Sequence, residues 1–314
     1  MHYRKLGKTG LEVSLVSFGS GGPSKLGQNT GLSAREQDAL VRKVLDLGIN
    51  LIDTSEGYGE SEAILGRALL RSSRDSYILA TKCLYKSPDG RIRHPEDLKL
   101  SIDRCLDRLS TDYVDIMQFH VLNSTDYFQV VDELYPVMMK AREEGKIRFI
   151  GFSEQFKKDP DHRVVNLALT AHPELWDTVM LKYGILNQYA AREALPLCEN
   201  HNVGVINMAV IREKLPNPLL LSNQIKVWKD EGFICQDEIS DENPLEWLLH
   251  GDVHSVVDAG YKFAADHPAI STVLTGTSSM LHLQSNVDSL EIPYLPKYDK
   301  TRLQQLFGDI AIYI

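Results

Sequence analysis

Four side chains with complementary acid–base chemistry lie close to the ends of short apolar segments: Asp53, Tyr58, Lys82 and His120. A carboxylate, a phenol, an ammonium and an imidazole together make a proton-transfer set rather than a packing set. Asp53, Lys82 and His120 end or just follow predicted strands, and Tyr58 lies in the loop after the first of them. A parallel barrel collects its strand ends at one mouth, so we expect these four groups to meet in one pocket.

Each of the four residues also has an ordinary structural explanation, as a helix cap, a surface aromatic, a solvated lysine or a core histidine. Together, however, they explain one another. The charge of Lys82 is expected to lower the phenol pKa of Tyr58 from its usual value of about 10. Asp53 can be the counter-ion of Lys82, and His120 can donate a hydrogen bond to a carbonyl oxygen. The set is therefore suited to protonating a carbonyl oxygen while hydride arrives at carbon.

The elements that must position these groups follow a regular alternation. After a short hairpin at residues 2–14, apolar strand-like segments alternate with amphipathic helical segments. The strands are expected at residues 15–21, 50–55, 77–82, 114–120, 146–153, 177–184, 203–210 and 271–276. The helices are expected at residues 33–48, 61–71, 95–109, 124–145, 161–173, 188–201 and 244–268. This order predicts a (β/α)8 TIM barrel with an N-terminal β-hairpin, in the α/β class.

The alternative fold is an open doubly wound sheet that binds a dinucleotide. Such a sheet would need GxGxxG after its first strand, whereas residues 19–24 read GSGGPS and lack the third glycine. Pro23 also stands near the point where the helix should start. Ser33 and Glu36, by contrast, have the spacing of a capping box for a helix that begins later. These features favour the barrel.

One segment interrupts the alternation. Residues 212–244 separate the seventh predicted strand from its helix and are rich in Pro, Asn and charged residues. A long loop excursion at a barrel mouth often shapes a ligand site, although a plain surface insertion is the alternative. We expect residues 1–314 to form a single domain that includes this excursion.

Composition excludes several classes of function. The chain has 314 residues and a net charge of −9, so a broad nucleic-acid surface is not expected. No apolar run approaches the roughly 20 residues that a membrane helix needs. The four cysteines form no CxxC pair, which fits a reducing, cytoplasmic location and predicts no metal. The sequence indicates no oligomeric state.

The motifs DTSEGYG, ATK, QFH, GKIRFIGFSE and VLTGTSS, with a later SN pair, resemble the aldo-keto reductase superfamily. The resemblance runs from about residue 3 to residue 290, and TKC with GTSS is similar to the branch of L-galactose and related aldose 1-dehydrogenases. It implies a barrel that binds NADP(H) or NAD(H) without a Rossmann motif. It also implies Tyr58 as general acid/base, Lys82 and Asp53 as the pair that tunes it, and His120 as the group that orients the carbonyl.

The resemblance implies cofactor positions as well. These are Ser20, Gly21, Ser153, Glu154, Met180, Met208, Ala209, Val210, Arg212, Gly276, Thr277, Ser278, His282 and Asn286. Glu154, Met180 and Met208 depart from the family, which usually has asparagine, glutamine and an aromatic there. Ser278 and His282 replace the Lys or Arg that many NADPH-specific members use, so a preference for NAD or NADP stays open. Arg212 could contact a phosphate as a bidentate donor.

The implied function is an NAD(P)-dependent oxidoreductase that interconverts an alcohol with a carbonyl on a small aldehyde, ketone or sugar. Tyr85, Val121 and Tyr183 are expected to line its substrate pocket. One alternative is a cofactor-sensing binding subunit on the same fold, with little turnover. Another is a lyase that forms a Schiff base on Lys82.

Overall fold

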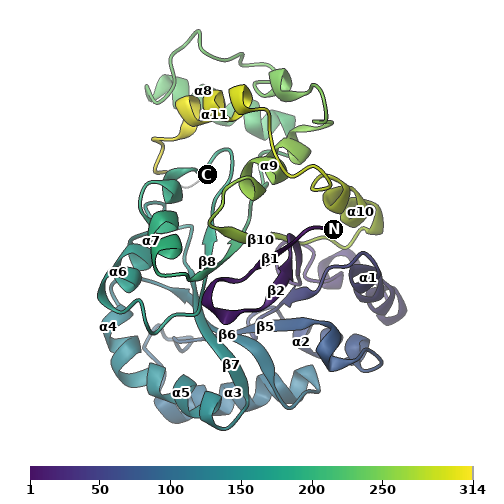
Figure 1. The fold of residues 1–314 in the computed structure, drawn as a ribbon, viewed down its shortest axis with the longest axis vertical. Coiled ribbons are helices and arrows are strands. Elements are labelled where there is room, and N and C mark those ends of the chain that lie inside the picture. The colour runs from purple at the N-terminus through teal and green to yellow at the C-terminus, as the bar shows by residue number, and fades with distance from the viewer. Residues whose placement is uncertain (313–314) are drawn as a thin grey trace.

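Eight parallel strands form a closed barrel in this computed structural model, which describes residues 1–312 (Figure 1). Around the barrel the strand order is β10-β3-β4-β5-β6-β7-β8-β9. The strands are β3 (Val16–Gly19), β4 (Leu51–Asp53), β5 (Ile78–Leu84), β6 (Val114–Leu122), β7 (Ile147–Glu154), β8 (Thr178–Lys182), β9 (Gly204–Met208) and β10 (Ile270–Thr275). The predicted (β/α)8 barrel is confirmed, and each expected strand segment overlaps an observed strand.

Helices surround the barrel because their apolar faces cover the outward side chains of the strands. The α-helices are α1 (Ala34–Asp46), α2 (Ser61–Leu69), α3 (Pro95–Leu109), α4 (Tyr127–Gln129), α5 (Tyr135–Glu143), α6 (Arg163–Ala171), α7 (Ala194–Asn200), α8 (Pro218–Asp230), α9 (Val256–Ala265), α10 (Met280–Asp288) and α11 (Lys297–Phe307). The capping box of Ser33 and Glu36 is present at the start of α1. Within residues 1–312, no helix has the length and apolarity needed to cross a membrane.

The N-terminal hairpin closes one end of the barrel. Its strands are β1 (Tyr3–Lys5) and β2 (Glu12–Ser14), which pair antiparallel. Leu6 and Val13 are fully buried and belong to the same apolar cluster as the interior side chains Leu51 and Ile206. Gly7 is needed at the contact, because a Cβ there would lie 2.3 Å from the backbone N of Gly204. The hairpin therefore leaves the opposite end of the barrel as the open mouth.

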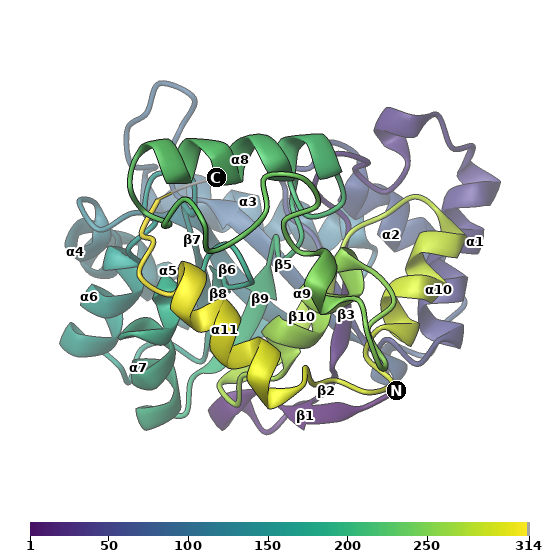
Figure 2. The ribbon, with the colours of Figure 1, turned by 90° about the horizontal axis from the view of Figure 1, so that it is seen from above.

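The segment at residues 212–244 is not simply the long loop that the sequence suggested. It contains the 13-residue helix α8, and α8 lies toward the mouth end of the barrel, opposite the hairpin (Figure 2). Trp228 of α8 is fully buried, and its ring centroid lies 5.7 Å from that of Phe307 in α11. α11 was not predicted, and the expected helix at 244–268 is reduced to a short 3-10 turn and α9. Contact with α11 therefore holds the excursion in place.

Candidate active site

Lys82 is the most buried charged group at the mouth. β4 and β5 pair so that Asp53 is level with Ala80, which brings the Asp53 carboxylate to the ammonium of Lys82. The Lys82 Nζ donates to both Asp53 carboxylate oxygens, at 2.8 and 2.7 Å, and to the carbonyl oxygen of Thr54 at 2.7 Å. Burial disfavours the ammonium most strongly of any single cause, but the charges of Asp53 and Tyr58 and the hydrogen bonds to them together outweigh it, so the pKa of Lys82 lies above its usual value. The ammonium is thus fixed and fully hydrogen-bonded.

Tyr58 lies beside this pair. The Lys82 Nζ is 4.9 Å from the centroid of the Tyr58 ring, and the Tyr58 hydroxyl is 3.5 Å from His120 Nε2. On its other side the ring packs on Gly21, where a Cβ would lie only 2.6 Å from a ring carbon. Burial raises the pKa of Tyr58, while the charges of Lys82 and Arg212 act in the opposite direction. The expected net lowering is therefore wrong for this structure, because lost hydration outweighs an ammonium already shared with Asp53.

His120 completes the group that the sequence predicted. Its Nδ1 is 2.9 Å from the Ser55 hydroxyl, and its ring stands edge-on to Tyr58 with centroids 5.4 Å apart. Burial, followed by the charge of Lys82, lowers the pKa of His120 to about 3, so the imidazole is neutral near pH 7. The Ser55 hydroxyl also lies 3.2 Å from the carbonyl oxygen of Lys82, so its one proton can go to either acceptor. When it goes to His120 Nδ1, the ring proton sits on Nε2 and can be donated to a substrate. The structure thus brings all four predicted groups together.

The wall of the mouth opposite this group is apolar at its base. Met180 and Met208 belong to the interior cluster, on neighbouring strands β8 and β9. Ser153 is level with Met180, and its Oγ accepts a hydrogen bond from the backbone N of Val121 at 2.9 Å. Val121 has a positive φ of 56°, which turns the chain at the end of β6. These residues line the interior where the resemblance placed the nicotinamide end of a cofactor.

Glu154 is not brought to the mouth as expected. Its Oε2 lies 2.7 Å from Nδ1 of the buried His162, and its Oε1 accepts from the backbone N of Lys182 at 2.8 Å. Burial opposes a charge on His162, but the carboxylate of Glu154 prevails and raises the pKa of His162. A fully buried carboxylate needs such a partner, and this pairing replaces the predicted contact to a carboxamide.

Two loops form the rim on the side of β9 and β10. Ala209, Val210 and Arg212 follow β9, and Ala209 adopts a positive φ of 56°. The Arg212 Nε is 3.2 Å from Glu213 Oε1, so the guanidinium keeps further donors. Gly276 follows β10 at a narrow gap, where a Cβ would lie 3.1 Å from the carbonyl oxygen of Gly19.

The remaining cofactor candidates surround the start of α10. The Thr277 hydroxyl accepts from the backbone N of Ser279. The Ser278 hydroxyl accepts from the Thr30 hydroxyl at 3.0 Å. His282 lies in the first turn of α10, and Asn286 donates to the Thr275 hydroxyl at 2.6 Å. These side chains lie together at the outer rim, with no Lys or Arg among them.

The three predicted substrate-pocket residues lie in different places. Val121 lies at the mouth. Tyr85 is buried and donates its hydroxyl to Asp126 at 2.8 Å, so it ties together the loops after β5 and β6. Tyr183 does not line the mouth, because its ring stacks on Phe263 with centroids 5.5 Å apart in the layer between strands and helices. It follows the inward residue Lys182 and so points outward.

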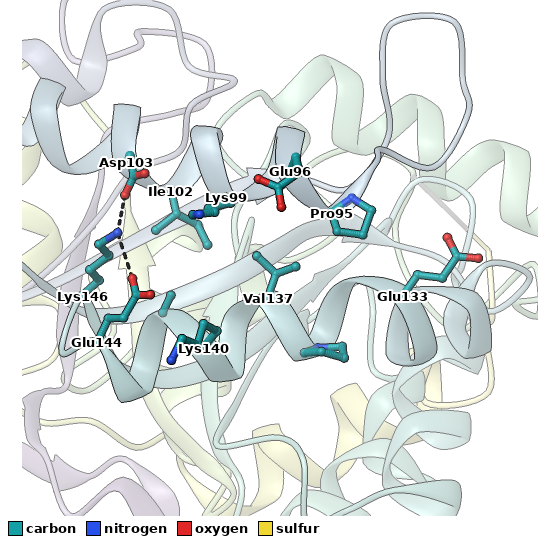
Figure 3. A pocket seen from close by; sticks show the side chains of 12 residues that line it. Pro95, Glu96, Lys99, Ile102, Asp103, Glu133, Val137, Lys140, Glu144 and Lys146 are labelled. Atoms are coloured by element: carbon teal, nitrogen blue, oxygen red, sulfur yellow. Dashed lines mark hydrogen bonds and ion pairs between the residues drawn. The ribbon is translucent and has the colours of Figure 1, made fainter.

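A separate groove of about 340 Å³ lies outside the barrel, between α3 and α5 (Figure 3). In it Lys146 pairs with Asp103 and Glu144. Apolar atoms of Ile102 and Val137 form its floor, and no member of the catalytic group lines it. The groove is an exposed helix–helix junction.

Sulfur and carboxylate groups also approach one another behind Lys82. Cys83 points away from the mouth and its Sγ lies 3.8 Å from that of Cys105; with Glu56 these ligand atoms lie within 4.8 Å of one another. Glu56, however, already accepts from the backbone N of Leu84 and from Arg93. Its carboxylate is therefore committed to holding the loop of Tyr58, and the absence of a metal stays a prediction.

Two contributors to the site were missed from the sequence. Ser55 holds His120, and its place in DTSEGYG between Asp53 and Tyr58 could have indicated this role. Lys182 was overlooked although it lies two residues after Met180, on the same face of β8. Both signals were present, but each depends on knowing which strands face one another.

Comparisons with known proteins agree with this geometry. The model of the Aldo/keto reductase family matches residues 17–307. L-galactose dehydrogenase from Arabidopsis thaliana is 33% identical over 295 residues, covering 90% of this chain and 86% of the relative. An NADH-specific methylglyoxal reductase from Escherichia coli is 31% identical over 335 residues, covering 96% and 97%.

A solved structure extends the comparison to the fold. The aldo-keto reductase AKR11C1 from Bacillus halodurans, in its holo form, superposes with a TM-score of 0.74. That match covers 100% of this chain and 98% of the other, at 24% identity, so it speaks for the fold alone. The family match spans nearly the whole chain, and residues 53, 58, 82 and 120 lie within its range. The chain therefore belongs to the aldo/keto reductase family of oxidoreductases.

Proposed function

We propose that this chain is an NAD(P)-dependent oxidoreductase that interconverts a carbonyl and an alcohol, with Tyr58 as its general acid/base. The observation that supports this most directly is the juxtaposition of the Tyr58 hydroxyl, 3.5 Å from His120 Nε2, with the ammonium of Lys82 beside the ring. A proton donor and a second donor thus converge on the place where one carbonyl oxygen can accept from both.

In the direction of reduction, Tyr58 gives its proton to the carbonyl oxygen as carbon receives hydride, and the alcohol leaves. The phenolate that remains is stabilised by the ammonium of Lys82, and it recovers a proton from solvent. His120 stays neutral and holds the carbonyl oxygen through Nε2. Asp53 keeps Lys82 charged and in place. Oxidation of an alcohol is the same sequence reversed.

The mouth suits a nicotinamide dinucleotide, which supplies the hydride from C4 of its ring when bound. The buried Ser20 hydroxyl has no hydrogen-bond partner among the described residues, so a polar group remains available beside Gly21. Ser153 keeps its hydroxyl proton for donation, since it accepts from Val121. Arg212 and the small residues around Gly276 would border the phosphates. Ser278 and His282 favour NADH, because neither brings a permanent positive charge to a 2′-phosphate.

The substrate class that we propose is a small aldehyde or aldose. The printed names of two relatives, an L-galactose dehydrogenase and a methylglyoxal reductase, support this choice. A cytoplasmic location completes the proposal, and it is supported by four free cysteines, three of them buried.

The test is a pair of titrations followed by an assay. NADH and NADPH are titrated against the purified chain by quenching of protein fluorescence, and methylglyoxal and L-galactose are then offered with the matching nucleotide. We expect NADH to bind at least as tightly as NADPH and one substrate to be turned over. Failure of both nucleotides to bind would overturn the proposal, and tight binding without turnover would favour a cofactor-sensing subunit.

A further inference from the structure

Tyr58 lies in a short segment whose backbone has unusual freedom. Gly57 and Gly59 flank it, and Gly59 adopts a positive φ of 62°. Glycine has more backbone conformations open to it than any other residue, so these two neighbours do not by themselves fix the direction of the phenol. The proposed proton transfer nevertheless needs the hydroxyl beside His120 Nε2, which lies 3.5 Å away. Contacts from outside the segment therefore have to hold it.

The side chain of Gln28 supplies such contacts. Its Oε1 accepts a hydrogen bond from the backbone N of Glu60 at 2.9 Å. Its Nε2 lies 3.1 Å from the carbonyl oxygen of Tyr58 and 2.9 Å from the Ser61 hydroxyl. The carbonyl oxygen of Lys25 is a third acceptor at 2.8 Å, so the two amide protons are shared among three acceptors. One side chain thus bridges the segment from Tyr58 to Ser61.

The direction of the Gln28 amide is set by these partners. A backbone N–H can only donate and a carbonyl oxygen can only accept, so the amide oxygen faces Glu60 and the amide nitrogen faces Tyr58. Gly59 lies between the two, and a Cβ there would come within 2.6 Å of the Gln28 Oε1. The absence of a side chain at position 59 therefore leaves the room that the amide occupies.

Gln28 is itself anchored at both ends of the turn that carries it. This turn is a 3-10 helix, Gln28–Thr30, in the loop between β3 and α1. Leu26, just before the turn, is 1% exposed and belongs to the main hydrophobic core. At the end of the turn, the Thr30 hydroxyl donates to the Ser278 hydroxyl, which ties it to the loop after β10. The amide can therefore act as a fixed support for Tyr58.

We propose that Gln28 is a positioning residue for the reaction, which acts through Tyr58 by fixing the backbone from which the phenol extends. The inference rests on the proposed oxidoreductase function and adds a residue to it. The partners of Gln28 are backbone groups and the Ser61 hydroxyl rather than the reacting atoms. A small rotation of the Tyr58 backbone displaces the hydroxyl most, because it stands at the far end of the side chain. Misplacement of a reacting group by about 1 Å can lower a rate about 100-fold.

The first experiment compares Gln28→Ala with Asn29→Ala, its matched control. Asn29 is the next residue of the turn, and its amide donates to the carbonyl oxygen of Pro23 in the same loop. Turnover of methylglyoxal and L-galactose is measured with the matching nucleotide. We expect Gln28→Ala to lower kcat about 5–50-fold, because the phenol is held less well, and to change NADH affinity less than about twofold. Asn29→Ala should keep kcat within about twofold. Equal losses in the two variants, or a loss of NADH affinity alone, would overturn the inference.

A double-mutant cycle tests whether the effect passes through the phenol. Tyr58→Phe has no hydroxyl to position, so adding Gln28→Ala should lower its residual turnover less than about twofold. A general loss of structure would instead lower turnover by the same factor in both backgrounds. That outcome would assign Gln28 to the stability of the loop and not to the position of Tyr58.

Hydrogen exchange reports the same contact without turnover. The backbone N–H of Glu60 donates to Gln28, so its exchange with deuterium should become at least about fivefold faster in Gln28→Ala and stay unchanged in Asn29→Ala. Mass spectrometry of peptides that cover residues 55–61 measures it. Unchanged exchange in Gln28→Ala would overturn the inference. If the wild type turns over neither substrate, the oxidoreductase proposal fails, and this measurement alone decides whether Gln28 fixes the Tyr58 segment.

Discussion

Two lysines face the mouth of this barrel from opposite walls, and their pKa values are shifted in opposite directions. Lys82 on β5 has the Asp53 carboxylate at 2.7 Å, and its pKa is raised. Burial, followed by the charge of Arg212, lowers the pKa of Lys182 on β8 to about 8. The barrel therefore stabilises the charge of Lys82 and disfavours the charge of Lys182. We call the wall formed by β4–β6, which carries the four groups proposed for catalysis, the chemical wall, and the wall formed by β7–β9 the Lys182 wall.

The largest expected effect tests the chemical wall. Tyr58→Phe should lower kcat about 10²–10⁴-fold, because the proton donor is lost, while NADH binding stays within about twofold. Tyr135→Phe is the control, since that hydroxyl donates to the carbonyl of Leu175 outside the mouth. Steady-state kinetics and fluorescence titration measure the two quantities. Near-normal turnover of Tyr58→Phe would show that the chemical wall does not supply the proton.

The two lysines should also differ in stability. Lys82→Met leaves Asp53 buried without its partner, so the free energy of unfolding should fall by about 3–5 kcal/mol. Lys182→Met removes a destabilised charge and should change it by less than about 1 kcal/mol. Denaturant unfolding at pH 7 measures both. Equal losses would show that the two ammonium groups are held alike, contrary to the comparison.

The pH dependence of stability gives a third distinction. The pKa of Lys182 is about 8 in the folded chain and 10.5 as its ordinary value, so between these the unfolded chain holds a proton that the folded chain has lost. Stability should therefore rise with pH in this window through Lys182. The difference in unfolding free energy between wild type and Lys182→Met should shift toward the wild type from pH 8 to pH 10. A constant difference would contradict the lowered pKa.

Substitution of Ser55 has the smallest predicted effect. It tests whether His120 needs a hydrogen-bond partner at Nδ1 to be oriented for the reaction. Ser55→Ala removes the partner of His120 Nδ1, so both neutral tautomers become populated. We expect kcat to fall about tenfold or less, since only an orienting contact is lost. Ser55→Thr keeps the hydroxyl and should recover most of the activity. Unchanged kinetics in Ser55→Ala would mean that His120 needs no orienting partner.

The sequence predicted the positions of side chains on the chemical wall better than those on the Lys182 wall, for a physical reason. Asp53, Lys82 and His120 stand at strand ends, and strand ends meet at the mouth of any parallel barrel. Glu154 was misplaced because its direction depends on His162, the N-cap residue of α6, which no strand pattern reveals. Tyr183 was misplaced because the inward face of β8 had not been assigned.

The excursion shows the same limit on a larger scale. The segment 212–244 is polar enough to suggest a loop, but Trp228 and Ile225 give α8 an apolar face. That face is covered in part by α11, which follows about 70 residues later in the chain. The composition of residues 212–244 does not indicate the contact with α11. A helix that this contact stabilises, such as α8, could therefore not be predicted from its own residues.

The packing of Tyr58 against Gly21 has a consequence for how this family member can vary. Every residue other than glycine would place a Cβ 2.6–2.7 Å from the ring carbons of Tyr58. Any side chain at position 21 would therefore displace the Tyr58 ring or the loop that follows β3. The orientation of the Tyr58 side chain thus depends on the backbone of the loop after the neighbouring strand β3.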